Sequence, residues 1–174
     1  MVHGIVVAAG GTVRVYSELG RGTTIRVYLP AVGTETVGAP SHEEPIPGGT
    51  ERILVLDDET MIVEMLAKTL SSLGYRVTIA RTAAEALEAF RTDPARFDAV
   101  ITDLTMPRMD GEAVARALLE ARPHLPVLVC TGFSEELTSE RLRGIGVREV
   151  LAKPVPRARL ARALRAALES STAP

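Results

Sequence analysis

Residues 99–107 read AVITDLTMP, an apolar run that ends on the carboxylate of Asp103 and leads into a loop containing Pro107. Three other pieces also place polar groups directly after an apolar or β-branched run: LDDE at 56–59, VCTG at 129–132 and LAKP at 151–154. Short apolar runs of this kind predict buried strands of a parallel sheet. Ligands of an open α/β sheet bind at the carboxyl ends of its strands, so the four pieces are expected to meet at one rim.

Strand and helix patterns alternate throughout residues 51–170. The predicted strands are 52–56, 76–80, 99–103, 126–131 and 147–152, and the predicted helices are 60–73, 82–91, 112–121, 134–143 and 157–169. Gly74 is expected to end the first helix, and Thr82 with Glu85 fits a capping box on the second. The alternation predicts an α/β fold, a doubly wound five-stranded parallel sheet with the flavodoxin-like order 2-1-3-4-5.

A stretch of linker composition divides the chain. Residues 31–50, AVGTETVGAPSHEEPIPGGT, contain three Pro and four Gly and have no apolar periodicity. They separate a head, residues 1–30, from a body, residues 51–174. In the head, residues 12–17 and 24–29 alternate around Gly20-Arg21-Gly22, which predicts a β-hairpin. A hairpin without further sheet partners is marginally stable.

Composition limits the class of protein. Apolar residues make up 46% of the 174 residues, while aromatic residues make up only 3%, so aliphatic side chains must build the core. The net charge of −2 is unlike that of a nucleic-acid-binding chain. A single cysteine, Cys130, excludes an internal disulfide and fits a reducing compartment. With no signal peptide or transmembrane pattern, a cytoplasmic protein is expected.

The polar groups of the predicted rim suit magnesium and a phosphoryl group. Asp57, Asp58 and Asp103 offer the hard oxygen ligands that Mg²⁺ prefers. Lys153 supplies a mobile positive charge for phosphoryl oxygens, and Thr131 supplies a hydroxyl donor. Each residue alone has a simpler interpretation, as a turn, a cap, a strand edge or a surface charge. Their occurrence together, each at a strand end, favours the functional interpretation.

Residues 51–170 resemble the receiver domain of two-component response regulators. The resemblance is carried by the acidic pair at 57–58, by the Asp followed by Met-Pro and then Met-Asp-Gly at 103–111, by Thr-Gly at 131–132 and by Lys-Pro at 153–154. It implies that Asp103 is the phosphoacceptor. It also implies that Asp58, Asp103 and the carbonyl of Thr105 bind Mg²⁺, with Asp57 as an outer, water-mediated ligand.

The same resemblance assigns roles on the other side of the rim. Thr131 and Lys153 correspond to the pair that senses the phosphoryl oxygens, and the Lys153–Pro154 bond is expected to be cis. One departure is at Val150, where the family usually has Tyr or Phe. An aromatic side chain that moves inward with the threonine therefore cannot report phosphorylation in this chain.

The head is similar to the C-terminal end of histidine-kinase ATPase domains, in which a Gly-x-Gly-Thr turn precedes the last strand. Here that turn is Gly20-Arg21-Gly22-Thr23, and His3 does not match a phosphoacceptor histidine. Only about 30 residues of such a domain are present, without the nucleotide-binding segments. The whole chain therefore resembles the tail of a hybrid histidine kinase, and no ATP binding or kinase activity is expected of it.

The site residues suggest three possible functions. The leading hypothesis is a receiver module that catalyses its own phosphorylation from a histidine kinase or a histidine phosphotransfer protein. A Mg²⁺-dependent phosphatase with an Asp nucleophile would need a second Asp at position 105, which is a threonine. A pure interaction domain would not need the complete set of site residues. The arginine-rich last helix, residues 157–169, is interpreted as a solvated face, with docking of an acidic helix as the alternative.

Overall fold

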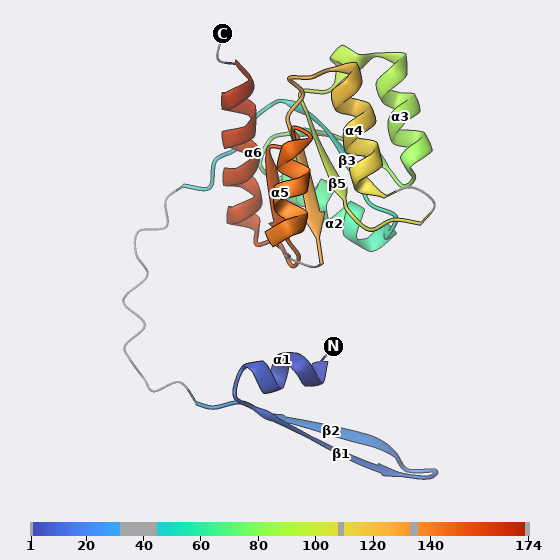
Figure 1. Ribbon diagram of the computed structural model, residues 1–174, viewed down its shortest axis with the longest axis vertical. Helices are drawn as coiled ribbons and strands as arrows, with labels where there is room; N and C mark the ends of the chain where they lie inside the picture. Colours follow the sequence, from blue (N-terminus) through green and yellow to red (C-terminus); the bar gives the residue numbers. More distant parts are fainter. Residues whose placement is uncertain (1, 32–44, 108–109, 133–135, 173–174) are drawn as a thin grey trace. The chain divides into compact units, whose positions relative to one another are not determined.

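The computed structural model of the chain describes residues 2–31, 45–107, 110–132 and 136–172. They belong to two compact units, Met1–Glu43 and Glu44–Pro174, which correspond to the head and the body (Figure 1). Most of the predicted linker, including His42, lies outside the described residues. No helix of the described part is both long enough and apolar enough to cross a membrane.

The body is built on a parallel sheet. Its strands are β3 (Arg52–Leu56), β4 (Arg76–Ala80), β5 (Ala99–Asp103), β6 (Val127–Thr131) and β7 (Glu149–Ala152). They lie in the order β4-β3-β5-β6-β7, and every neighbouring pair is parallel. Numbered within the body, this is the predicted order 2-1-3-4-5, so the predicted fold class is confirmed.

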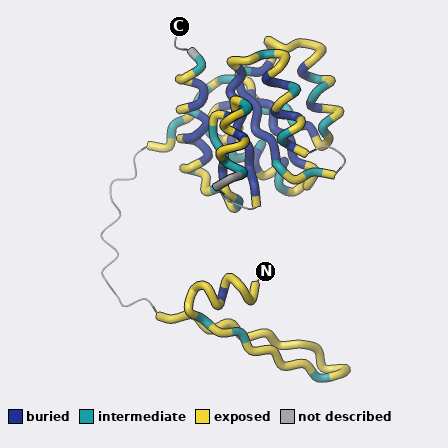
Figure 2. The backbone as a smooth tube through the Cα atoms, viewed as in Figure 1, coloured by how far each residue is buried: buried dark blue, intermediate teal, exposed yellow. Residues whose placement is uncertain are grey.

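Helices cover both faces of this sheet (Figure 1). They are α2 (Thr60–Ser71), α3 (Ala83–Thr92), α4 (Gly111–Ala121), α5 (Glu136–Gly144) and α6 (Arg157–Thr172), and a 3-10 turn, η1 (Pro94–Arg96), precedes β5. Successive strand residues point to opposite faces. Ile53 packs in the core with α2 and α6, whereas Leu54 packs in the core with α3, α4 and α5. The central strands β3, β5 and β6 are therefore almost entirely buried, and Figure 2 shows the buried residues gathered along the sheet.

Several element boundaries differ from the prediction. Strand β7 begins at Glu149 rather than at 147, because the N–H of Val147 donates to the carbonyl of Leu142 in the turn after α5. Helix α2 ends at Ser71, and Gly74 follows with a φ of +98°, a conformation that favours glycine. On α2, Val63 and Leu70 are fully buried and Leu66 is nearly so.

The capping prediction for α3 is only half right. The hydroxyl of Thr82 accepts a hydrogen bond from the N–H of Glu85, as expected for a helix cap. The carboxylate of Glu85, however, accepts from the N–H of Arg81 rather than from that of Thr82. The return hydrogen bond of Glu85 therefore reaches one residue further toward the N-terminus than in a standard capping box. Ser134, predicted to cap α5, lies outside the described residues.

The body begins earlier than residue 51. The N–H of Gly49 donates to the carbonyl of Leu73, and a Cβ at Gly48 would lie 2.3 Å from the same carbonyl oxygen. A Cβ at Gly74 would in turn lie 2.6 Å from the carbonyl oxygen of Gly49. These close backbone contacts require glycine at positions 48 and 74, so the last residues of the predicted linker pack as part of the body.

The head consists of a helix, α1 (Val2–Ala8), and an antiparallel hairpin of β1 (Thr12–Glu18) and β2 (Gly22–Tyr28). The predicted hairpin is therefore present. Among residues 2–31 only Val6 is buried, and apolar side chains such as Val15 and Ile25 are more than 60% exposed. The head thus has almost no core of its own.

Candidate functional site

Four strands of the body deliver their polar residues to one end of the sheet. Asp57 directly follows β3, Asp103 and Thr131 are the last residues of β5 and β6, and Lys153 directly follows β7. The register keeps these ends level, because Asp103 pairs with Cys130 and Thr131 pairs with Ala152. The predicted rim is therefore formed by parallel strands of matched length.

Lys153 joins two of these strands by charge. Its Nζ lies 2.7 Å from Oδ2 of Asp57 and 2.7 Å from Oδ1 of Asp103. Both carboxylates are buried, with 1% of Asp57 and 7% of Asp103 exposed. Burial alone would lower the pKa of the Lys153 amine, but its hydrogen bonds to Asp103 and Asp57 outweigh burial and raise the pKa above its ordinary value.

The second oxygen of each carboxylate is held by its own loop. Oδ1 of Asp57 accepts from the N–H of Glu59 at 2.9 Å, and Oδ2 of Asp103 accepts from the N–H of Thr105 at 3.0 Å. The backbone after each strand thus orients the carboxylate that precedes it. Each oxygen still has a lone pair for a further partner, because an ionised carboxylate accepts about four hydrogen bonds.

Thr131 and Lys153 are also connected through the backbone. The N–H of Lys153 donates to the carbonyl of Thr131 at 2.7 Å, and the Lys153–Pro154 bond is cis, as expected. Thr131 is 2% exposed. Val150 lies on β7 opposite Val129 and is partly buried, so the position that is usually aromatic contributes to the core on the side of α3, α4 and α5.

Asp58 lies apart from the two buried carboxylates. It is exposed and lines a cavity of about 710 Å³ together with Arg81, Leu87, Met106 and Pro107, among others. The guanidinium of Arg81 pairs with Glu64 at 3.1 Å. Neither Arg81 nor the cavity was indicated by the sequence, because the cavity arises only where the loops after β4 and β5 meet.

Gly111 is a second residue whose importance the structure reveals. A Cβ at this position would lie 1.9 Å from the carbonyl oxygen of Asp103. The N–H of Gly111 donates to the carbonyl of Leu104 at 2.8 Å, and Asp110 caps α4 by accepting from the N–H of Ala113. The start of α4 therefore packs directly against the backbone of Asp103, and only glycine allows that approach.

The residues present fit a hydrated magnesium ion by their chemistry. Asp57, Asp58 and Asp103 supply hard carboxylate oxygens, and Mg²⁺ in proteins commonly keeps several waters beside one or two carboxylates. Within the described residues, no three His, Cys, Asp or Glu side chains are already grouped as a metal site. The ammonium of Lys153 instead supplies the positive charge between Asp57 and Asp103.

Other residues noted in the sequence are structural. Cys130 is buried in the core, and burial raises the pKa of its thiol to about 12, which keeps the thiol protonated. His3 and His124 are exposed. Arg159 on the last helix is exposed and pairs with Glu149. The interpretation of this helix as a solvated face is wrong for Arg165, which is partly buried and pairs with Glu51.

Comparison with known proteins agrees with this fold. The chain belongs to the family of response regulator receiver domains, whose family model matches residues 53–165. The chain is 30% identical over 178 residues to the sensor kinase CckA of Brucella abortus, which covers 97% of this chain and 19% of that protein. It is 40% identical over 123 residues to the response regulator MprA of Mycolicibacterium vanbaalenii, covering 70% and 52% of the two chains.

Solved structures share the fold of the body. A receiver domain protein from Clostridium thermocellum is 31% identical with a TM-score of 0.66, and the match covers 69% of this chain and 95% of that one. The chemotaxis protein CheY4 of Vibrio cholerae is 28% identical with a TM-score of 0.64, covering 68% and 99%. The chain is thus a receiver domain of two-component systems, and it spans only about half or less of the curated relatives described above.

Proposed function

We propose that Asp103 accepts a phosphoryl group from a phosphohistidine, with Mg²⁺ bound at the rim by Asp57, Asp58, Asp103 and the carbonyl of Thr105. The observation that carries the proposal is the buried carboxylate of Asp103, held 2.7 Å from the Lys153 amine at the end of the central strand β5. Receiver domains generally use Mg²⁺ and interact with histidine kinases or phosphotransfer proteins.

The residues divide the transfer between them. An oxygen of Asp103 forms the new O–P bond while the N–P bond of the phosphohistidine breaks, and the electron pair returns to the imidazole. Lys153 stands within reach of the incoming phosphoryl oxygens and offsets their charge. Thr131 supplies a hydroxyl donor at the end of β6. Bound magnesium would neutralise phosphoryl charge during the transfer.

Nothing in the site favours the alternative functions. An Asp-nucleophile phosphatase would need an acid at position 105, but Thr105 has only a hydroxyl side chain and its N–H is engaged by Asp103. Two buried carboxylates that both pair with Lys153 are costly to fold. A binding module that is never phosphorylated would not require them. Phosphoacceptance uses every one of these residues.

Labelling with acetyl phosphate tests the proposal. With Mg²⁺ present, intact-mass measurement should show a single added phosphoryl group, and Asp103→Asn should show none. Asp110→Asn is the matched control, because Asp110 is a nearby carboxylate that only caps α4. Undiminished labelling of Asp103→Asn, or labelling that persists unchanged when EDTA removes Mg²⁺, would refute the assignment.

We infer further that the head is the end of a histidine-kinase ATPase domain and that this chain is the receiver-bearing tail of a hybrid kinase in the cytoplasm. The match to the sensor kinase CckA extends over 97% of the chain and therefore includes the head. The exposed apolar side chains of α1 and the hairpin support the same inference, since in a complete domain such side chains pack against a further layer.

Removal of the head separates the two units experimentally. Deleting residues 1–43 should leave Asp103 labelling and the unfolding midpoint of the body unchanged, because the first compact unit ends at Glu43. Deleting residues 1–49 should lower the midpoint, because it also removes the N–H of Gly49 that bonds Leu73. The full chain should not bind ATP. Micromolar ATP affinity, measured by calorimetry, would contradict the inference that the head is only the end of an ATPase domain.

A further inference from the structure

The hairpin of the head has two chemically different faces. Residues that are paired across the two strands lie on the same face of the hairpin. One face is apolar and contains the pairs Val13 with Val27 and Val15 with Ile25. The opposite face, here called the arginine–tyrosine face, is formed by three cross-strand pairs: Thr12 with Tyr28, Arg14 with Arg26, and Tyr16 with Thr24. A layer of a larger domain would cover the apolar face and leave the arginine–tyrosine face in solvent.

Arg14 and Arg26 stand directly opposite each other on this face. Like charges at directly opposed positions of an antiparallel pair are destabilising. Neither arginine makes a hydrogen bond or an ion pair with another residue of the described head. The acid farther along the same face, Glu18, already accepts from Tyr16 and pairs with Arg21. Two arginines therefore occupy opposed positions of the two strands, without an acidic partner among the described residues of the head.

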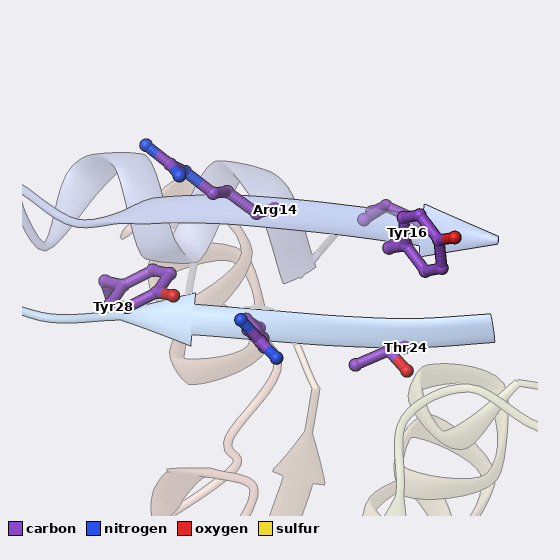
Figure 3. Close-up of a pocket in the computed structure, with 6 residues that line it drawn as sticks. Arg14, Tyr16, Thr24 and Tyr28 are labelled. Atoms are coloured by element: carbon purple, nitrogen blue, oxygen red, sulfur yellow. The ribbon is translucent and has the colours of Figure 1, made fainter.

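A hollow of about 360 Å³ opens beside these arginines. Figure 3 shows Tyr28 and Tyr16 toward its two ends, with Arg14 between them along the strand direction. The tyrosines are exposed, at 47% and 67% respectively. Arginine and tyrosine are the side chains enriched where proteins bind one another, because they combine large contact area with directional hydrogen bonds.

We propose that the arginine–tyrosine face binds an acidic segment of a partner protein, with a carboxylate held between Arg14 and Arg26. Guanidinium groups bind carboxylates through paired hydrogen bonds, and the two phenol rings would pack against the backbone and side chains on either side. A nucleic acid fits less well, since it needs a longer basic surface than two arginines.

Peptide binding to the full chain tests this surface. The chain contains no tryptophan, so a Trp-Gly-Glu-Asp-Glu-Gly peptide can be followed by its own fluorescence anisotropy. Arg14→Gln and Arg26→Gln should each weaken binding by about tenfold, which corresponds to about 1.4 kcal/mol. Arg21→Gln is the matched control, because Arg21 lies in the turn of the same hairpin and pairs with Glu18.

A second measurement distinguishes binding from mere structure. Arg26→Gln removes the like-charge pair, so amide exchange of the hairpin should slow even as peptide binding falls. Faster exchange in this variant would indicate a structural role and overturn the proposal. Absence of peptide binding to the full chain, or equal weakening by Arg21→Gln, would also overturn it. If single-stranded DNA binds more tightly than the peptide and is weakened by the same two arginine variants, the ligand of this face is a nucleic acid and the proposal is wrong.

Discussion

The amine of Lys153 lies 2.7 Å from the carboxylate of Asp103, although Lys153 follows β7 and Asp103 is the last residue of β5. The same amine lies 2.7 Å from Asp57. One cation thus stabilises two buried anions at the rim. Its removal would leave two negative charges close together in a poorly solvated place, and that arrangement attracts a cation.

Lys153→Ala should therefore destabilise the body in the absence of magnesium. We expect a loss of about 2 kcal/mol in the free energy of unfolding, less than for a fully buried pair because the lysine side chain is 23% exposed. Lys68→Ala is the control, since the side chain of Lys68 is exposed on α2. Urea unfolding measures both, and added Mg²⁺ should restore more stability to Lys153→Ala than to the control. Equal losses in the two variants would contradict the expected role of Lys153.

Gly111→Ala should disturb the phosphoacceptor loop. A Cβ at Gly111 would lie 1.9 Å from the carbonyl oxygen of Asp103, so the backbone must shift, at a cost of about 1–3 kcal/mol. The rate of labelling by acetyl phosphate should fall with it. Gly144→Ala is the matched control, because no atom lies within 4 Å of a Cβ there. If both variants label at the wild-type rate, the contact between α4 and Asp103 has no influence on the site.

Thr131→Ala should still accept a phosphoryl group but lose much of the conformational response. We expect the hydroxyl to donate to the new phosphoryl oxygens, because a hydrogen bond to an anion is short and strong. Val150 is too small to fill space left by the threonine, so we expect a population shift in residues 132–143 without an aromatic switch. Part of this segment, including Phe133, lies outside the described residues.

Amide NMR of the free and beryllofluoride-bound protein measures that response. Thr131→Ser keeps the hydroxyl and should keep the shift, which makes it the matched control. Chemical-shift changes confined to residues 57, 58 and 103, with residues 136–150 unchanged in the wild type, would show that this mechanism is wrong.

Acid should destabilise the opposite end of the sheet. The Arg52 guanidinium lowers the pKa of Asp98 below its ordinary 3.8, and the Arg165 guanidinium lowers that of Glu51 below its ordinary 4.5. A carboxyl whose pKa is depressed by folding stabilises the folded state above its unfolded pKa, and this stability is lost as the pH falls through the folded value. The loss should therefore begin near pH 4.5 and continue below 3.8.

Urea midpoints at about pH 7 and about pH 3 measure this acid dependence. In Arg52→Gln and Arg165→Gln, the decline between the two pH values should be smaller than in the wild type, because these variants lack the cation that lowers the carboxyl pKa. Arg148→Gln is the control, since Arg148 is exposed and no shift of the carboxyls involves it. If stability falls by as much in both variants as in the wild type, the ion pairs of Arg52 with Asp98 and Arg165 with Glu51 are not the cause of the acid sensitivity.

Much of the fold followed from local patterns. Apolar runs such as Ala99–Asp103 identified the strands, and the rule that parallel strands present their carboxyl ends together placed Asp57, Asp103, Thr131 and Lys153 at one rim. Strand boundaries followed less closely. Val147 was included in the predicted strand 147–152, but the N–H of Val147 donates to the carbonyl of Leu142 rather than to a neighbouring strand. The pattern of apolar residues indicates which residues are buried, but it does not show whether a buried residue belongs to a strand or to a turn.

The sequence by itself determined the order of strands and helices, the position of the acidic rim, and the division into head and body. Only the tertiary structure decided which groups touch: Lys153 with Asp57, Arg165 with Glu51, and Gly111 with the backbone of Asp103. Local patterns depend on neighbours along the chain and can be read from it. Ion pairs and close backbone contacts depend on distances between segments far apart in sequence, which are set only when the sheet and its helices pack together.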